Sequence, residues 1–458
     1  MQRFSFKEIT KSIILVVLFF TTILLLYLNW TQSGSKFSIA DIIPIEIRKA
    51  EYVSENQILR PSRIIISNES KSFSEFNGNS VTVFDTAKAE VKKLLASSGV
   101  IVTEITKEQY DAATAEFASV QLYFDCDIPF ESFCKHVGDR APASSDIVRD
   151  FYILTFSEAD NYSFFIRSQD GCFRVISDVE TGAVQTIKTL VSGKETIMYP
   201  TSEILGGASD VFIPINMEIN YYEGAASPYI AAGEEIAETV FGDTFDFVRK
   251  ITDTFGNVTY MYSYGAKRLT ILNDGRLEFK EDTTTGTSDG FYADLETAIA
   301  FLSSTDSFAA GDLRLYRVEE LRSLQANRIR GYRFSFIQPA GDLAVSAAEP
   351  AAVIEVLGGK IAYATRRLLF LSYTQGEAYP AYDASNMIAE NSSAIYERLT
   401  SERADSADAA FRYVADRIED IYPSYLEREG RLLPVWMLKI AGRTFAFNLL
   451  TGESYGLV

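Results

Sequence analysis

Residues 13–28 read Ile-Ile-Leu-Val-Val-Leu-Phe-Phe-Thr-Thr-Ile-Leu-Leu-Leu-Tyr-Leu. This stretch decides how the rest of the chain is organised. It contains no charged side chain, and only Thr21 and Thr22 interrupt its apolar run. With its flanking residues it reaches the roughly 17 to 25 residues, at about 1.5 Å each, that a helix needs to cross a hydrocarbon core of about 30 Å. We therefore predict a transmembrane helix that includes Ile13, Leu18, Thr21, Thr22, Leu25, Leu28 and Trp30.

The residues on either side of this stretch predict its orientation. Arg3, Lys7 and Lys11 precede it and are opposed only by Glu8. The positive-inside rule places such an end in the cytoplasm. Trp30 lies where an amphipathic ring prefers the outer headgroup region. The sequence therefore predicts a single-pass protein of the cell membrane, with its N-terminus cytoplasmic and the bulk of the chain outside the cytoplasm.

A cleaved signal peptide is the alternative, because a basic start and an apolar run serve both purposes. A signal peptide has an apolar core of about 7 to 15 residues and ends in an Ala-x-Ala-like site. Here the apolar run is longer, and the only cluster of small residues after it is Ser33-Gly34-Ser35. We therefore favour a retained anchor that stays in the lipid bilayer.

The outside part is acidic and long enough for several folded units. The 458 residues carry a formal charge of −19, and because the first 35 contribute +2, the rest carries −21. Such a surface repels nucleic-acid phosphates, so we expect no nucleic-acid partner. The outside part also exceeds the size of a single hydrophobic core. We predict an anchor segment in residues 1–35 and three units in residues 36–190, 191–283 and 284–458.

Helical and strand patterns occur in blocks along the outside part. Apolar side chains have helical spacing in residues 81–97, 228–241, 290–302, 384–399 and 409–421. Strand patterns follow in consecutive runs, with Asp-Gly turns at residues 170–171 and 274–275 and a further strand pair expected to turn at residues 180–182. Because helices do not alternate one to one with strands, a doubly wound parallel sheet is disfavoured. The predicted fold class is α+β, a single N-terminal transmembrane helix followed by about three units of antiparallel sheet packed with helices.

Two stretches near the C-terminus resemble each other. Residues 353–363 (VIEVLGGKIAY) and 436–447 (WMLKIAGRTFAF) each place glycine between two strand patterns, and Gly359 and Gly442 are 83 residues apart. A hairpin alone would produce this likeness, but helical patterns precede both stretches. We therefore predict duplicated helix-strand units in the C-terminal part.

Three cysteines and one histidine restrict disulfide and metal chemistry. Cys126, Cys134 and Cys172 allow at most one disulfide; Cys126 and Cys134 are the pair closest in sequence, and three free thiols are an equal alternative. His136 lies near two of these cysteines and two aspartates, but the spacing fits none of the usual Cys/His zinc patterns. We expect no metal and no cofactor.

One short motif suggests an enzyme. Ser132-Phe133-Cys134-Lys135 matches the Ser-x-x-Lys motif of penicillin-binding proteins and β-lactamases. The companion Lys-Thr-Gly is absent from the chain, and no Ser-x-Asn stands at a plausible distance. A cell-wall enzyme using Ser132 and Lys135 is therefore disfavoured, and we predict that the chain is not an enzyme.

Clustered aromatic side chains suggest a binding function instead. Tyr260, Tyr262 and Tyr264 alternate, which predicts that all three lie on one face of a strand. Such a stripe usually packs in a core, but it could line a groove for cell-wall glycan or peptide. A binding or sensing module for such ligands is the alternative function. The pair Arg366-Arg367 is interpreted as a solvated strand edge.

A family resemblance rests on the two ends of the chain. At the N-terminal end, these features are the short basic start and the helix ending in Leu28-Asn29-Trp30. At the other end they are the segments Leu433-Pro434-Val435-Trp436 and Phe447-Asn448-Leu449-Leu450-Thr451-Gly452-Glu453. Together they resemble the YycH family, regulators of the WalK/WalR two-component system in low-GC Gram-positive bacteria. The repeated order of helix and strands resembles the related YycI and PepSY-type domains. The resemblance covers nearly the whole chain as an order of elements, but its specific residues lie only at the two ends.

The resemblance implies an extracytoplasmic modulator without an active site. Such a protein would bind a WalK-like sensor histidine kinase, partly through its membrane helix, with a YycI-like protein as a further partner. Ser12, Thr21 and Thr22 are the hydroxyl side chains that could bond to a neighbouring helix, although they can equally bond to their own i−4 carbonyls. Each such contact contributes about 0.6 to 2 kcal/mol, so the outside units must also contribute to binding.

The predicted topology can be tested with a reporter fusion. A reporter that works only in the cytoplasm, fused after Thr31, should be inactive, because the anchor would place it outside. Activity of this fusion would contradict the predicted orientation.

Overall fold

The computed structural model of the chain describes residues 21, 53–68, 72–76, 78–193, 195–207, 211–226, 229–282, 286–305, 313–323, 328–341, 343–347, 349–367, 369–373, 378–428 and 431–458. The chain divides into two units, Met1–Ile47 and Arg48–Val458. Thr21 is the one described residue of the first unit, and it is helical. The other residues of the predicted transmembrane stretch lie outside the described ones. Within the described ranges, no helix is both long and apolar enough to cross a bilayer.

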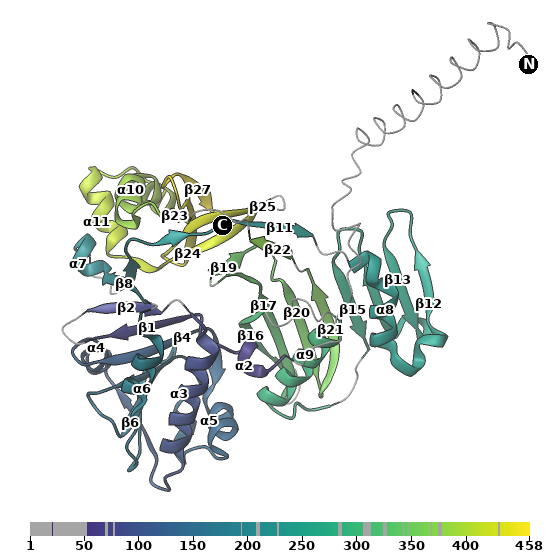
Figure 1. Cartoon of the computed structure of the whole chain (residues 1–458), viewed down its shortest axis with the longest axis horizontal. Coiled ribbons are helices and arrows are strands. Elements are labelled where there is room, and N and C mark those ends of the chain that lie inside the picture. Colours follow the sequence, from purple (N-terminus) through teal and green to yellow (C-terminus); the bar gives the residue numbers. More distant parts are fainter. Residues whose placement is uncertain are drawn as a thin grey trace, which may run out of the picture. The chain divides into compact units, whose positions relative to one another are not determined.

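The first large sheet of the second unit has nine described strands, all antiparallel to their neighbours. Their order is β3-β7-β6-β5-β4-β1-β2-β8-β9, and Figure 1 labels β1, β2, β4, β6 and β8 among them. Near the centre, β1 pairs with β4 from Arg63 opposite Tyr123 to Ser67 opposite Ser119. The strands are β1 (Arg63–Ser67), β2 (Phe73–Phe76), β3 (Ile101–Ile105), β4 (Ser119–Pro129), β5 (Asp150–Ser157), β6 (Ser163–Arg167), β7 (Cys172–Ile176), β8 (Glu195–Pro200) and β9 (Phe212–Pro214).

Helices cover the two faces of this sheet unequally. Helices α3 (Ser80–Leu95), α5 (Phe130–Gly138) and α6 (Ala183–Val191) share one apolar core with the inward side chains of the strands. On the opposite face, α4 (Lys107–Ala115) covers only the part where Tyr110 meets Phe165. The short helices α2 (Glu55–Ile58), η2 (Ser145–Ile147) and α7 (Thr201–Leu205) complete this part of the fold. The rest of the second face is left open by the described helices.

The second large sheet has eight described antiparallel strands in the order β12-β13-β14-β15-β21-β20-β17-β16. Helices α8 (Tyr229–Phe241) and α9 (Phe291–Thr305) pack on one face of it, and its core continues into that of the first sheet. The strands and short helices are η3 (Gly242–Phe247), β12 (Arg249–Thr252), β13 (Val258–Tyr262), η4 (Ser263–Gly265), β14 (Lys267–Ile271), β15 (Leu277–Glu281), β16 (Arg314–Arg322), β17 (Ile329–Ile337), β20 (Ala352–Leu357) and β21 (Lys360–Arg366).

The uncovered face of the eight-stranded sheet carries paired charges. Arg333 stands opposite Glu319 on one neighbouring strand and Glu355 on the other. Its guanidinium nitrogens lie 3.0 Å from a Glu319 oxygen and 2.6 Å from a Glu355 oxygen. Opposite charges on directly paired positions stabilise a sheet whose face meets water.

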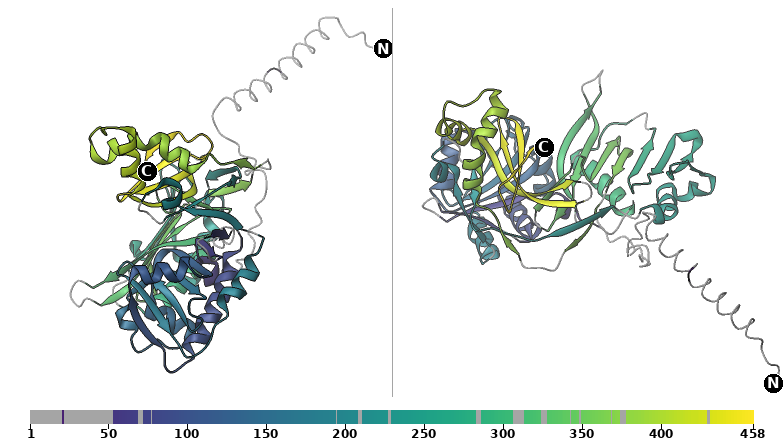
Figure 2. Two further views of the ribbon diagram at one scale, coloured as in Figure 1. Left: turned by 90° about the vertical axis from the view of Figure 1, so that its left-hand side faces the viewer. Right: turned by 90° about the horizontal axis from the view of Figure 1, so that it is seen from above.

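The third sheet contains the C-terminal strands, in the order β18-β19-β24-β25-β26-β27. Only β19 and β24 pair in parallel among its described strands. Helices α10 (Ala384–Thr400) and α11 (Ala407–Ala415) cover one face, as Figure 2 shows. Under them the Trp436 indole nitrogen donates to the Tyr382 carbonyl at 2.8 Å. The strands are β18 (Pro339–Ala340), β19 (Leu343–Ser346), β24 (Ile418–Arg428), β25 (Arg431–Ile440), β26 (Arg443–Asn448) and β27 (Ser454–Leu457).

Two small pairings link the larger sheets. Strand β10 (Glu218–Ile219) pairs with β23 (Tyr379–Pro380), and β11 (Tyr222–Ala226) pairs with β22 (Leu369–Tyr373). Each pairing therefore joins the chain after the first sheet to the segment that leads into α10.

The two stretches that resemble each other in sequence are both hairpins. The turn between β20 and β21 has Gly358 and Gly359 at φ 56° and 71°, and the turn between β25 and β26 has Ala441 and Gly442 at φ 49° and 70°. Two successive positive φ angles are typical of the type I′ turn, which matches the twist of antiparallel strands. This shared turn accounts for the sequence likeness, and the larger duplication stays a prediction.

The α+β class with several antiparallel sheets packed with helices is confirmed. The strand pair expected at residues 180–182 is wrong, because α6 begins at Ala183 and places Val184, Ile187 and Val191 on one buried face. The helix expected over residues 409–421 ends at Ala415, and Ile418 already begins β24. Helices α4 and α5 were not predicted.

The predicted boundaries at 190 and 283 stay a prediction. Sheet membership runs across both of them. Strands β8 and β9 follow residue 190 and join the nine-stranded sheet, and the eight-stranded sheet takes strands from both sides of residue 283.

Gly331 in β17 provides a test of the second sheet. A Cβ at this position would lie 1.7 Å from the Val356 carbonyl oxygen on β20. Gly331→Ala should therefore push the strands apart and cost about 1 to 3 kcal/mol of stability or more. Gly99→Ala is the matched control, because the nearest atom to its Cβ would be 3.8 Å away. Equal urea midpoints for the two variants would contradict this packing.

Candidate ligand-binding cleft

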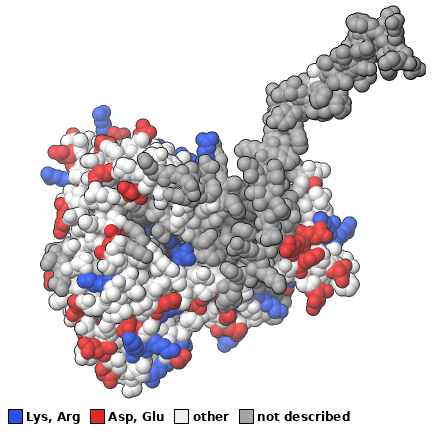
Figure 3. Space-filling model, in the orientation of Figure 1, with Lys and Arg blue, Asp and Glu red and all other residues white. Residues whose placement is uncertain are grey.

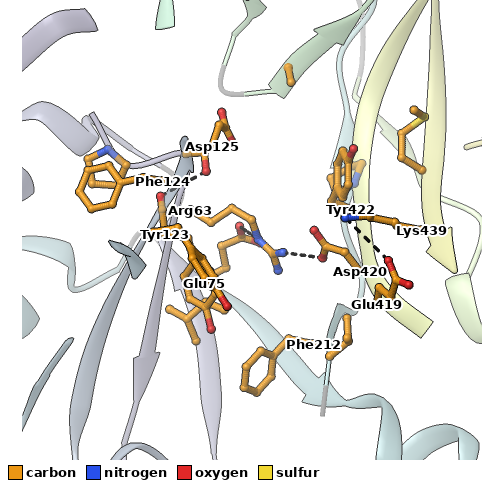
Figure 4. Close-up of a pocket in the computed structure, with 18 of the residues that line it drawn as sticks. Arg63, Glu75, Tyr123, Phe124, Asp125, Phe212, Glu419, Asp420, Tyr422 and Lys439 are labelled. Atoms are coloured by element: carbon orange, nitrogen blue, oxygen red, sulfur yellow. Dashed lines mark hydrogen bonds and ion pairs between the residues drawn. The ribbon is translucent and has the colours of Figure 1, made fainter. Parts of the chain in front are cut away.

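A cleft of about 2180 Å³ lies where the open face of the nine-stranded sheet and the uncovered face of the C-terminal sheet approach each other. One wall presents Arg63, Glu75 and Tyr123, and the other presents Asp420 and Tyr422 (Figure 4). Pockets for small molecules measure roughly 300 to 1,000 Å³. The cleft therefore has room for an oligomeric ligand.

Alternation along the strands explains why these side chains face the cleft. In β1, Ile64 and Ile66 belong to the core under the helices, so Arg63 points to the other face. In β24, Ile421 belongs to the core under α10 and α11, so Asp420 and Tyr422 point to the cleft. Each wall is thus the side of a sheet that faces away from its main helix-covered core, and it carries both charged and apolar side chains.

Arg63 connects the two walls. Its Nε lies 3.1 Å from Glu75 Oε1 on β2, and its Nη1 lies 3.1 Å from Asp420 Oδ1 on β24 (Figure 4). Burial alone would lower the pKa of the Arg63 guanidinium, but the carboxylates of Glu75 and Asp420 outweigh burial and raise it. The guanidinium also lies over the Tyr123 ring, 5.9 Å from its centroid. Arg63 therefore stays charged and holds both walls.

Two further ion pairs join strands around the cleft. Arg314 on β16 places Nε 2.8 Å from Asp125 Oδ2 on β4, and its side chain is only 7% exposed. Arg367, which follows β21, contacts both Glu427 oxygens, at 3.0 and 3.2 Å. Because a charge-assisted bidentate contact also fixes geometry, the Arg367–Glu427 pair positions the chain segments that it joins as well as neutralising charge.

Tyrosine hydroxyls in the cleft stay protonated at neutral pH. Burial raises the pKa of Tyr123 to about 12, although Arg63 opposes the shift. Burial also raises the pKa of Tyr422, and the nearby Asp420 adds to the effect. Neutral phenols can both donate and accept hydrogen bonds.

Outside the cleft, Figure 3 shows acidic and basic side chains intermixed over the visible face.

The residues considered for a metal site do not come together. His136 stacks on Tyr292 with ring centroids 3.9 Å apart, and its Nε2 lies 3.1 Å from Glu55 Oε2. In the part of the chain that the structure describes, no group of three or more His, Cys, Asp or Glu residues could hold a metal. Cys126, Cys134 and Cys172 are all free and buried.

The Ser-x-x-Lys motif lies on α5, away from the cleft. Lys135 Nζ forms an ion pair with Glu131 Oε1 at 2.5 Å, and both side chains are well exposed. Among the described contacts of Lys135, none is with the Ser132 hydroxyl. The lysine is therefore held by a carboxylate one helical turn before it rather than by the serine.

Two other sequence interpretations are wrong. Arg366 is not at a solvated edge: it is 2% exposed, and its Nη1 donates to the Leu302 carbonyl and the Thr305 hydroxyl at the end of α9. Tyr264 does not continue the stripe of Tyr260 and Tyr262, because β13 ends at Tyr262 and Tyr264 has a φ of 56° and is fully exposed.

No local sequence motif marks the cleft residues. Arg63 and Asp420 are 357 residues apart, so no local motif joins them. The available signal was weaker: a charged side chain begins the apolar β1, and Asp420 and Tyr422 flank a core residue. Such patterns indicate an open face but not what lies opposite it.

The buried cysteines give a further prediction. Burial raises the pKa of Cys134 to about 12 and also raises that of Cys126 and Cys172. A maleimide should therefore label the native protein slowly near pH 7 and all three thiols rapidly in denaturant. The native state should also lose stability as the pH rises above about 8.5, where thiols of the unfolded chain ionise. Fast native labelling at Cys134 would contradict its burial.

Comparisons with known proteins fit this fold. A family model described as the YycH protein, N-terminal domain, matches residues 8–191. A search of curated proteins found no match. The crystal structure of YycH from Bacillus subtilis is similar with a TM-score of 0.56 and 13% sequence identity, over 87% of this chain and 98% of that chain.

Two other solved structures are less similar. An uncharacterized protein from Eubacterium rectale has a TM-score of 0.35 and 12% identity over 54% of this chain and 90% of that one. The C-terminal domain of YpeB from Bacillus megaterium has a TM-score of 0.27 and 10% identity over 51% and 98%. Both scores are too low to indicate a shared fold. The family match identifies residues 8–191 as similar to the YycH N-terminal domain, and the chain shares its fold with Bacillus subtilis YycH along most of both chains.

Proposed function

We propose that the chain is a membrane-anchored extracytoplasmic regulator that binds and modulates the sensor histidine kinase of a cell-envelope two-component system. The observation that carries this proposal is the family match over residues 8–191. That range contains the predicted transmembrane stretch as well as most of the first sheet. The similarity to the YycH family suggests a regulator of a WalK/WalR-type system, with a YycI-like protein as a further partner.

The arrangement of the cleft supports regulation rather than catalysis. Arg63, Arg314 and Arg367 are each held in ion pairs with carboxylates of this chain. A general acid or base must instead be within reach of a substrate proton and have a pKa near the working pH. The cleft charges described here join strands to one another, which suits a module whose shape responds to binding.

The predicted membrane helix would supply one contact with the kinase. Lipid solvates apolar side chains as well as a neighbouring helix does, so helix association depends on close packing and hydrogen bonds. Thr21 and Thr22 at the middle of the span are the candidates for those bonds. Contacts of about 0.6 to 2 kcal/mol are too weak alone, so the folded part outside must bind as well.

A second candidate function is the binding of cell-wall glycan or peptide. The volume of the cleft and its aromatic and charged lining favour this alternative. The two functions are compatible, since a ligand that changes the folded part would alter its effect on a kinase. A Ser-Lys enzyme is disfavoured by the ion pair between Lys135 and Glu131.

Crosslinking of the full-length protein in its own membrane tests the proposal. A sensor histidine kinase should be recovered. Replacing residues 9–30 with an unrelated apolar helix should reduce both the crosslink and the change in kinase output. Thr21→Val with Thr22→Val, which keeps size and removes the hydroxyls, should weaken the contact by roughly threefold to 30-fold.

Leu18→Ile is a suitable control, because it changes neither polarity nor volume. If no sensor kinase is recovered, the proposed function is wrong. If a kinase is recovered but the exchanged helix leaves its output unchanged, the helix contact is wrong and binding belongs to the folded part.

A further inference from the structure

Arg167 differs from Arg63, Arg314 and Arg367, which pair with carboxylates in the cleft. It ends β6 and lies in a row across four adjacent strands, where Arg63 pairs with Tyr123, Tyr123 with Ile153, and Ile153 with Arg167. Arg167 and Tyr152 both line the cleft, and both are half-buried. This row therefore has a guanidinium group at each end, and both line the cleft.

The two guanidinium groups have different partners. Arg63 is neutralised by Glu75 and Asp420, whereas Arg167 forms no ion pair with any carboxylate of the described residues. The groups that act on its pKa are Tyr152, Tyr110, Tyr123 and Cys172; their influence outweighs burial, which alone would lower it. A half-buried cation without a counter-ion is costly, because it loses hydration without gaining an ion pair.

The tyrosines around Arg167 differ in what their hydroxyls already bind. The Tyr110 hydroxyl pairs with the Thr155 hydroxyl at 2.7 Å, and the Tyr123 hydroxyl donates to Gln121 Oε1 at 3.2 Å. Burial raises the pKa of Tyr152, so its hydroxyl keeps its proton at neutral pH, and the nearby Arg167 acts in the opposite direction. Among the described residues, no acceptor takes the Tyr152 hydroxyl proton, so this proton is available to a ligand.

We propose that Arg167 and Tyr152 form a binding site for a carboxylate group carried by a ligand that lies along the cleft. A guanidinium presents two parallel N–H donors that match a carboxylate, and a neutral phenol adds a third donor. The ligand supplies the counter-ion that the chain does not. The rest of an oligomeric ligand can extend toward Arg63 and Tyr123, since the cleft is far larger than one carboxylate requires.

The carboxylate could belong to a short peptide or to an acidic saccharide, and probes separate the two sources. We would titrate the full-length protein in detergent with a mixed pool of short peptides that have free C-terminal carboxylates, with the same pool amidated, and with oligosaccharides containing uronic acid. Isothermal titration calorimetry measures each affinity. Binding of the free-acid peptides and not of the amidated pool assigns the site to peptide, and binding of the uronic-acid oligosaccharides alone assigns it to saccharide.

Variants identify the residues. Arg167→Met should weaken carboxylate binding by roughly tenfold or more, and Arg167→Lys, which keeps charge but loses the paired donors, should weaken it less. Tyr152→Phe should also weaken it. Arg317→Met is the matched control: Arg317 also lines the cleft, but it is exposed and paired with Glu319, so affinity should not change.

A stability measurement distinguishes a ligand site from a structural role. Removing an uncompensated half-buried charge should leave the urea midpoint of Arg167→Met equal to or above that of the wild type. A clearly lower midpoint would assign Arg167 a structural role and overturn the proposal. Equal affinities for wild type and Arg167→Met, or no binding of any carboxylate probe at millimolar concentration, would overturn it as well. Because no kinase takes part, these outcomes are independent of the proposed regulatory function.

Discussion

Each large sheet of this protein is packed with helices mainly on one face, and this constraint determines where its polar chemistry can lie. Side chains alternate along a strand, so a covered apolar face obliges the other face to be polar or to meet another part of the chain. In the eight-stranded sheet the free face meets water and carries the charges around Arg333. In the nine-stranded and C-terminal sheets the free faces approach each other. The cleft thus results from leaving the C-terminal sheet and most of the nine-stranded sheet uncovered by helices on one side.

The sequence was sufficient for the elements that depend on local pattern. Apolar side chains recur at every second residue in most strands and at helical spacing in α3, α9 and α10, so these elements could be located from the sequence. The pattern failed where elements are short. Helix α6 buries Val184 and Ile187, and these β-branched residues after a turn signal resembled a strand. The segment after Ala415 was misassigned because its isoleucines continue a helical spacing while pairing with β25 instead.

The candidate site was beyond such reasoning for a different reason. Arg63 and Asp420 meet only when two sheets built from opposite ends of the chain are in place. The sequence also does not reveal that Arg167 lacks an ion pair with any described carboxylate, because this depends on which carboxylates the fold places near it. Conversely, Ser132 and Lys135 matched a motif and stand on one helix, yet the lysine pairs with Glu131. A match to a short motif such as Ser-x-x-Lys therefore does not establish a catalytic pair when another side chain, here Glu131, binds the lysine.

Arg63 is shared between a carboxylate on its own sheet and one on the opposite sheet, and this sharing affects how the cleft can move. If the walls separate, Asp420 is released into water, where its side chain is already 38% exposed, and Arg63 keeps Glu75 as its counter-ion. Losing one partly exposed ion pair costs on the order of 1 kcal/mol or less. Separating the two walls therefore costs little free energy. Thermal motion can widen the entrance of the cleft without leaving a buried charge unpaired. Dissolved salt screens the ion pair and makes this widening easier.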